Sequence, residues 1–299
     1  MSQDLIAIYE DLRDQTAELV QQGKYREALS LCDEALAAAR LGGDPVLSDR
    51  ILCNRAAILT ELGDGAKSRQ ELRRLLLRSS DLRTLFLGSY TLARTYDLEG
   101  DSEKAFFYAR IAERHAQELG SPEQIASSHN FIGNLLVSRS DFEPALSEFT
   151  LALNSLPPGP SLRRAQYLDN IAYCNAMRGK LMVAFRMLFE SLRICRRLGL
   201  RNQEASSRLT LAYTYLQAER PRRALSHGRR SLAIAEKTGD QSTVKYGLFV
   251  LGEAEKSVGN PLAARHHFSR LQEEFYPHMP NVCDLLLLID VQNLINLKA

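Results

Sequence analysis

The chain has 299 residues, of which 45% are hydrophobic and 25% are charged, with a formal net charge of +2. This is ordinary globular composition with ample apolar material for a large core. The opening stretch MSQDLIAIYEDLRDQ has acidic residues and no apolar core, and no run of roughly eighteen uncharged apolar residues occurs anywhere, so we expect neither a signal peptide nor a membrane span.

One pattern recurs along the chain: an apolar helix, a short turn, and a second apolar helix. The turn residues are spaced 40, 37, 40, 39, 40 and 40 positions apart and are Gly23, Gly63, Gly100, Ser140, Gly179, Glu219 and Gly259. Five positions after each turn stands a small residue, namely Ala28, Ser68, Ala105, Ala145, Ala184, Ala224 and Ala264. Twelve positions before these stand Thr16, Ala56, Ala93, Gly133, Ala172, Ala212 and Gly252. Since antiparallel helices approach closely only where side chains are small, these positions predict the crossing points of helix pairs.

The helix boundaries agree with this register. Asp44-Pro45, Ser121-Pro122 and Asn260-Pro261 each place a capping residue before a proline at the first helical position. The pattern predicts a single array over residues 1–299, with repeats at about 4–41, 45–78, 81–119, 122–156, 160–198, 201–237 and 240–276. A final helix is expected over residues 280–298.

These residues resemble the signature positions of the tetratricopeptide repeat family. The fourth repeat matches best, through Ile132, Gly133, Leu136, Ala145, Phe149, Ala152 and Pro157. The usual family period is about 34 residues, whereas the spacing here is close to 40, so each helix is nearly a turn longer. The chain is thus similar to the long-repeat subclass of kinesin light chains, Rap-type regulators and MalT-like regulators. The resemblance implies an all-α, right-handed superhelical solenoid of about seven antiparallel helix pairs with a C-terminal capping helix.

The final helix is apolar over more than one face. One apolar side is expected from Val282, Leu285, Leu286, Ile289, Leu294 and Ile295. Further apolar residues lie off this side, namely Leu287, Leu288, Val291 and Leu297. A cap should carry a polar outer side. Either this helix packs deeply, or it offers a surface for a partner or for a second copy of the chain as a homodimer.

In the family, ligands commonly lie on a concave face lined by first helices. Counting from the crossing residues, the positions expected on this face are Tyr90, Arg94, Asn130, Asn134, Gln166, Asp169, Tyr173, Tyr213, Tyr246 and Phe249. Asparagine carries both a donor and an acceptor and can pair with the amides of an extended peptide, while tyrosines give contact area favoured in recognition surfaces. The alternative is that the tyrosines pack between repeats and the asparagines are solvated surface.

Residues 161–230 are rich in arginine. The densest positions are Arg193, Arg196, Arg197, Arg222, Arg223, Arg229 and Arg230. Arginine-rich surfaces suit carboxylate or phosphate partners, so an acidic protein partner is one interpretation. A solvated outer face is the other, because many of these residues lie on second helices. Nothing in the sequence has a zinc-finger or RNP-type pattern that would favour nucleic acid.

Catalytic motifs are absent from the sequence. It has no GxGxxG, GxxxxGKS/T or GxSxG pattern, and its six histidines have no HExxH-like spacing. The five cysteines are scattered without a CxxC pair, which favours reduced thiols in a cytoplasmic protein. We expect no metal, no cofactor and no enzymatic activity, and a scaffold or adaptor that binds a peptide segment or partner protein. The alternative is a ligand- or peptide-responsive sensor module of the Rap or MalT-like type.

Overall fold

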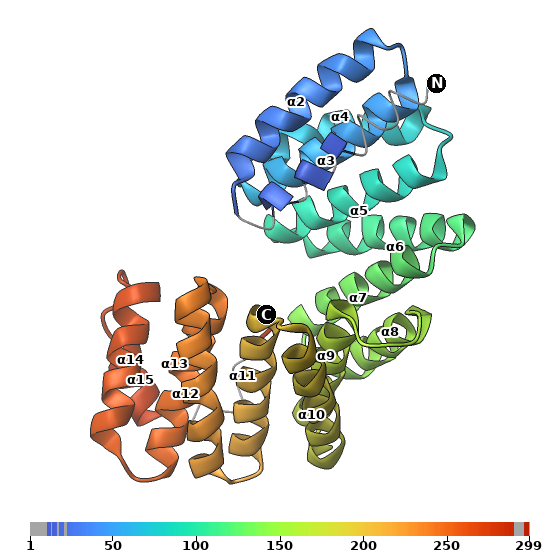
Figure 1. The fold of residues 1–299 in the computed structure, drawn as a ribbon. Coiled ribbons are helices and arrows are strands. Elements are labelled where there is room, and N and C mark those ends of the chain that lie inside the picture. Colours follow the sequence, from blue (N-terminus) through green and yellow to red (C-terminus); the bar gives the residue numbers. More distant parts are fainter. Residues whose placement is uncertain (1–10, 13, 17, 21–22, 290–295, 299) are drawn as a thin grey trace. The chain divides into compact units, whose positions relative to one another are not determined.

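The computed structural model describes residues 11–289 and 296–298, apart from residues 13, 17, 21 and 22. Every regular element in this part of the chain is an α-helix, which confirms the all-α prediction. The helices are α2 (Tyr25–Leu41), α3 (Pro45–Glu61), α4 (Gly65–Arg78), α5 (Leu82–Leu98), α6 (Ser102–Leu119), α7 (Pro122–Ser138), α8 (Phe142–Ser155), α9 (Leu162–Met177), α10 (Leu181–Leu198), α11 (Arg201–Gln217), α12 (Pro221–Thr238), α13 (Gln241–Ser257), α14 (Pro261–Phe275) and α15 (Val282–Leu288) (Figure 1). Among them, none is long and apolar enough to cross a membrane.

The chain divides into two compact units, Met1–Leu135 and Leu136–Ala299, and the prediction of a single array over 1–299 stays a prediction. In the first unit α2 packs on α3, α3 on α4 and α5, and α5 on α6. In the second unit each helix from α8 to α15 packs on the next one along the chain, and the first helices α9, α11 and α13 also contact one another in that order (Figure 1). Side chains from helices 40 residues apart therefore meet on one face of the second unit.

The turns between paired helices share one backbone conformation. All seven predicted turn residues have a positive φ, from 56° at Glu219 to 81° at Gly63. The residue after each turn donates its N–H to the carbonyl five residues earlier, at 2.8 to 2.9 Å, as in Arg220 to Tyr215. This six-to-one hydrogen bond is the Schellman ending of a helix, and it requires a left-handed residue at the turn. The predicted turn register is thus confirmed.

The predicted crossing residues are all buried. Gly252 on α13 gives the clearest reason, because an added β-carbon would lie 2.3 Å from Cε1 of Phe268 on α14. The second unit also repeats one hydrogen bond at the 40-residue interval. Ser191 donates to the carbonyl of Ala165 at 2.8 Å, and Ser231 donates to that of Ala205 at 2.6 Å. Successive repeats therefore pack in equivalent ways.

The final helix is shorter than the sequence predicts. α15 ends at Leu288, and residues 296–298 are not helical, so the helix predicted over 280–298 is wrong in extent. Lys256 explains the ending, because its Nζ donates to the carbonyls of Leu286 at 2.8 Å and Ile289 at 2.9 Å. The lysine satisfies carbonyl groups that a continuing helix would have used. Residues 290–295 lie outside the described part of the chain.

The turns yield a first prediction. Glu219 is exposed and adopts φ 56°, a conformation that costs a non-glycine residue about 1 kcal/mol or more. We expect Glu219→Gly to raise the free energy of unfolding by about 1 kcal/mol. Gly179, with φ 71° and open space around its Cβ position, is the matched control. Gly179→Ala should lower stability by a similar amount in denaturant titrations, and an unchanged midpoint for both variants would contradict the turn assignment.

The helix crossings yield a second prediction. Gly252→Ala should lower the free energy of unfolding by about 1–3 kcal/mol, because the new methyl group must displace the ring of Phe268. Gly247 lies on the same helix, but a β-carbon there meets its nearest neighbour at an ordinary 3.7 Å. Gly247→Ala should therefore be neutral or slightly stabilising, since alanine favours the helix by about 1 kcal/mol over glycine. Equal thermal unfolding midpoints for the two variants would refute the crossing at Gly252.

Candidate functional site

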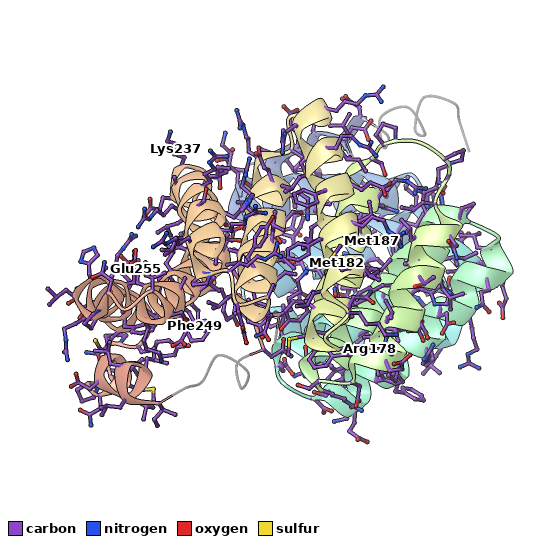
Figure 2. All side chains as sticks on the ribbon, turned by 90° about the horizontal axis from the view of Figure 1, so that it is seen from below. Arg178, Met182, Met187, Lys237, Phe249 and Glu255 are labelled. Carbon is purple, nitrogen blue, oxygen red and sulfur yellow. The ribbon has the colours of Figure 1, made fainter. Side chains whose placement is uncertain are left out.

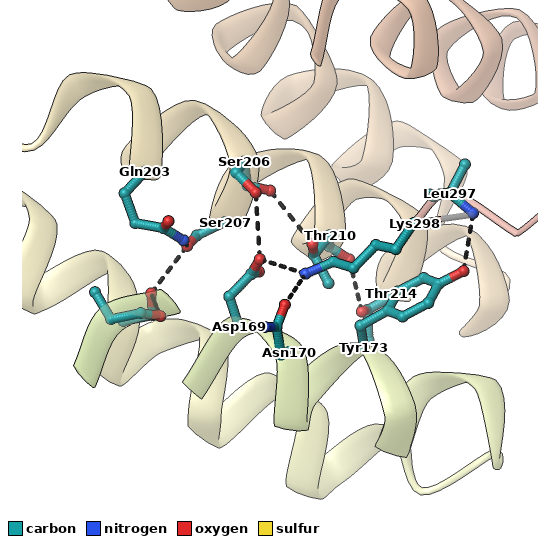
Figure 3. Close-up of polar contacts among 12 residues, drawn as sticks. Asp169, Asn170, Tyr173, Gln203, Ser206, Ser207, Thr210, Thr214, Leu297 and Lys298 are labelled. Atoms are coloured by element: carbon teal, nitrogen blue, oxygen red, sulfur yellow. Dashed lines mark hydrogen bonds and ion pairs between the residues drawn. The ribbon is translucent and has the colours of Figure 1, made fainter. Parts of the chain in front are cut away.

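A cavity of about 270 Å³ lies on the face formed by the first helices of the second unit. Its lining comprises Ser206, Leu209 and Thr210 of α11, Ser242, Thr243 and Tyr246 of α13, and Leu297 and Lys298. Asp169, Asn170 and Tyr173 of α9 adjoin it through their contacts with Ser206 and with residues 296–298. The site therefore combines the inner faces of three successive first helices with a segment from much later in the chain (Figure 3).

Residues 296–298, hereafter the 296–298 segment, are held by side chains of α9. The ammonium group of Lys298 lies 2.7 Å from Oδ2 of Asp169 and 2.7 Å from Oδ1 of Asn170 (Figure 3). The hydroxyl of Tyr173 accepts the N–H of Leu297 at 2.9 Å and donates to Oδ1 of Asn296 at 2.7 Å. The segment is thus bound through its backbone and through its side chains.

Asp169 is the electrostatic centre of the site. Its side chain is 2% exposed, and Oδ2 accepts from Ser206 Oγ at 3.2 Å as well as from Lys298. Oδ1 is buried and has no hydrogen-bond partner within the described residues. A buried carboxylate is strongly penalised unless it is paired with a cation. The lysine therefore compensates a charge that this face would otherwise leave unbalanced.

Two of the predicted tyrosines are interior groups. Tyr173 and Tyr213 are fully buried, with ring centroids 6.2 Å apart, and the Tyr213 hydroxyl donates to the sulfur of Met177 at 3.4 Å. Burial raises the pKa of Tyr213 to about 12, against a smaller opposing effect of its hydrogen bond with Gln217. Burial also raises the pKa of Tyr173 far above its ordinary value. Both hydroxyls therefore stay neutral and act only as hydrogen-bonding groups.

The other predicted positions of the second unit differ in access. Tyr246 lines the cavity, and Gln166 is part-buried on α9. Phe249, labelled in Figure 2 on α13, is 3% exposed and belongs to the core. For Tyr213 and Phe249 the packing interpretation of the aromatic positions is therefore the better one. Tyr246 is part-exposed at the cavity.

The predicted positions of the first unit have their own surroundings. Tyr90 packs its ring 5.6 Å from that of Phe86 and 5.3 Å from that of Phe131. Arg94 forms an ion pair with Glu61, and both line a second cavity of about 220 Å³. Asn130 is part-buried and Asn134 is exposed on α7. The prediction that Arg94, Asn130 and Asn134 form one binding surface with Gln166 and Asp169 draws on residues of both units and stays a prediction.

Sequence reasoning missed several residues of the site. Ser206 occupies the same register position as Gln166 and Tyr246, six residues before a crossing residue, so a signal for it existed. Ser206 carries only a small hydroxyl, whereas these two equivalents carry an amide and an aromatic ring. Asn170 and Thr243 fall outside the counted positions. The sequence predicts Lys298 on the final helix, but α15 ends ten residues earlier, at Leu288. The repeat pattern does not predict the contacts of Lys298.

The seven arginines singled out in the sequence are all exposed on the second helices α10 and α12. Arg229 pairs with Glu255 at 2.7 Å, and Arg223 lies 5.7 Å from the ring centroid of Tyr215. Arg193 and Arg197 line a surface cavity of about 460 Å³ beside Pro158–Pro160. These residues therefore form a patch on helices other than those that carry Asp169.

His227 of α12 lies among arginines and stacks on Tyr215, with ring centroids 5.4 Å apart. Burial is the largest cause that lowers its pKa to about 4, followed by the charges of Arg208, Arg230, Arg196 and Arg223. The unfolded chain binds this proton at a pKa of 6.5, so it takes up more protons than the folded chain between the two values. Stability contributed by neutral His227 is therefore full above pH 6.5 and is lost as the pH falls toward 4.

A third prediction follows from this shift. On acidification to about pH 5 the wild-type chain should lose at most about 2 kcal/mol through His227, since one pKa unit corresponds to about 1.4 kcal/mol. His227→Phe keeps a ring against Tyr215 but cannot be protonated, so its unfolding midpoint should decline less over the same range. The measurement is urea unfolding at a series of pH values. An identical decline in both proteins would disprove the role of His227.

Comparisons with known protein families and solved structures agree with the fold of paired helices. Residues 163–237 match the sequence model of the tetratricopeptide repeat family. The apo form of RapI has a similar structure, with a TM-score of 0.70 and 13% identity over 97% of this chain and 85% of that chain. A Rap protein complexed with competence and sporulation factor has a TM-score of 0.68 and 13% identity, over 89% of this chain and 76% of that chain. The Rap conjugation gene regulator of plasmid pLS20, in complex with a Phr peptide, has a TM-score of 0.64 and 16% identity, over 90% of this chain and 76% of that chain.

A search of curated protein sequences finds no significant match. The paired helices and their left-handed turns have the fold of tetratricopeptide repeat solenoids, and residues 163–237 match the sequence model of that family. Within that class the chain resembles the Rap proteins in fold, as the sequence suggested.

Proposed function

We propose that the face formed by α9, α11 and α13 binds a peptide or an unfolded segment of a partner protein. One observation carries the proposal: the site already holds a non-helical piece of polypeptide, the 296–298 segment, through its backbone and side chains. The chemistry that accepts this segment is general for extended polypeptide, because hydroxyl groups such as that of Tyr173 act as both donor and acceptor.

Two similar structures support the same interpretation. One Rap protein was solved with competence and sporulation factor and another with a Phr peptide. Their identity to this chain is only 13% and 16%, so they support the fold and make a peptide ligand a reasonable proposal for this chain. In this proposal the protein works by binding and not by catalysis. It acts in the cytoplasm, in keeping with five buried cysteines that form no disulfide.

Two forms of this function differ in what binding does. A scaffold or adaptor keeps its shape and holds the partner. A sensor module of the Rap or MalT-like type changes conformation when the peptide binds, and small-angle scattering with and without peptide distinguishes the two. An acidic partner for the arginine patch and a homodimer through α15 stay predictions, and Leu285 and Leu288 are exposed there at 50% and 85%.

The proposed function gives a fourth prediction. The chain has no tryptophan, and exposed Ser242 lines the cavity, so Ser242→Trp should fill the site and report on it by fluorescence. Exposed Ser226 on α12 is outside the cavity lining and provides the matched control, Ser226→Trp. Decapeptides are selected from a displayed library on the wild-type chain. Their affinity should fall at least about tenfold, or 1.4 kcal/mol, for Ser242→Trp and stay unchanged for Ser226→Trp.

Affinity is measured by titration of each purified variant, with circular dichroism as the check that both stay helical. If the selected peptides bind both variants as tightly as the wild type, the cavity between α11 and α13 is not the binding site.

A further inference from the structure

We propose that the 296–298 segment is an internal ligand of this site, and that a peptide which displaces it presents a lysine or arginine side chain to Asp169. The inference rests on the peptide-binding function proposed above. It adds the chemical class of the ligand and a competitor built into the chain itself.

The lysine contact is the first support. Lys298 places one ammonium group on two acceptors, Asp169 Oδ2 and Asn170 Oδ1, each at 2.7 Å. The same nitrogen lies 5.5 Å from the ring centroid of Tyr173, within the range of a cation–π contact. Lys298 is 20% exposed and Asp169 is 2% exposed, so the pair is shielded from water. Water therefore screens the attraction within this pair less than it screens an ion pair exposed at a protein surface.

The backbone contacts are the second support. Tyr173 accepts the N–H of Leu297, and Asn296 bridges between Tyr173 and the N–H of Lys298 at 3.0 Å. The Asn296 side chain also donates to the carbonyl of Val137 at 2.7 Å. Leu297 is 5% exposed. The segment therefore has the contacts of a specifically bound ligand: the buried side chain of Leu297, a hydrogen-bonded backbone and the charge of Lys298 paired with Asp169.

The charge of Asp169 is the third support. Without Lys298, the described contacts leave this carboxylate one hydroxyl donor, Ser206 at 3.2 Å, and no cation. A carboxylate on this face that has lost its cation favours an incoming ammonium or guanidinium group. The site thus selects for a basic side chain, the opposite charge preference from that of the arginine patch on α10 and α12.

The size of the contact makes displacement feasible. The segment is tethered to α15 through the intervening chain, and a short tether gives an effective concentration in roughly the millimolar range. Its described contacts come from only three residues, while the cavity extends along Ser242, Thr243 and Tyr246 of α13. A longer basic peptide can keep the Asp169 contact and add contacts to α13. It can therefore compete with the tethered segment.

The test uses the full chain and a fluorescent decapeptide with the sequence of residues 290–299, DVQNLINLKA. Lys298→Glu should release the internal segment, because it places a carboxylate against Asp169, and Lys298→Arg should retain it. We expect the decapeptide to bind the Lys298→Glu chain at least about tenfold more tightly than the wild type or Lys298→Arg. Adding Asp169→Asn to Lys298→Glu should abolish that gain, as should replacing the lysine of the decapeptide by alanine.

Hydrogen exchange gives an independent readout. The amide of Leu297 should exchange at least about tenfold faster in Lys298→Glu than in Lys298→Arg, because its bond to Tyr173 is lost. Equal decapeptide affinity for wild type and Lys298→Glu, or no binding to either, overturns the internal ligand, and so does unchanged exchange at Leu297. The library peptides of the fourth prediction distinguish this failure from a failure of the proposed function. If their affinity still falls in Ser242→Trp, the face binds peptides even though the 296–298 segment does not compete with them.

Discussion

Close contact between helices at small residues is the constraint on which every repeat depends. A β-carbon at Gly252 would collide with Phe268, and the alanines at equivalent positions are at most 2% exposed. The left-handed turns follow from the same constraint, because a helix must end abruptly for its partner to return at short range. Even Glu219 adopts that conformation in the absence of a glycine. Packing between helices therefore outweighs the local preference of the residue at the turn.

The same packing builds the site. First helices that lie next to one another bring residues 40 positions apart together, so Asp169, Leu209 and Phe249 are structural equivalents in three repeats. Their chemistry differs because each repeat needs only a small crossing residue and tolerates variety elsewhere. Asp169 is the buried charge, Leu209 lines the cavity, and Phe249 belongs to the core. A regular scaffold thus carries one irregular, specific centre.

The arginine patch and Asp169 lie on different helices of the second unit. The arginines of the patch are exposed on α10 and α12, where solvent screens their charges, and Arg229 also pairs with the buried Glu255. Asp169 lies on α9 in a setting where water does not screen its charge. The charge of Asp169 is therefore less screened by water than the charges of the seven exposed guanidinium groups. The sequence left open a solvated outer face or an acidic partner for the arginines, whereas the burial of Asp169 supports the basic ligand proposed for the site on α9, α11 and α13.

The amino-acid sequence by itself determined the helix pairs, the seven turns and the small crossing residues, because these depend on local spacing that repeats every 40 residues or so. It also located Asp169, Tyr173 and Tyr246 by register. It could not separate the buried Tyr213 from the accessible Tyr246, since both fit the same helical period. Only the tertiary structure showed that Lys298 contacts Asp169, 129 positions earlier in the chain. Residues 296–298 are not part of the repeat, so the 40-residue period in the sequence does not predict which residues they contact.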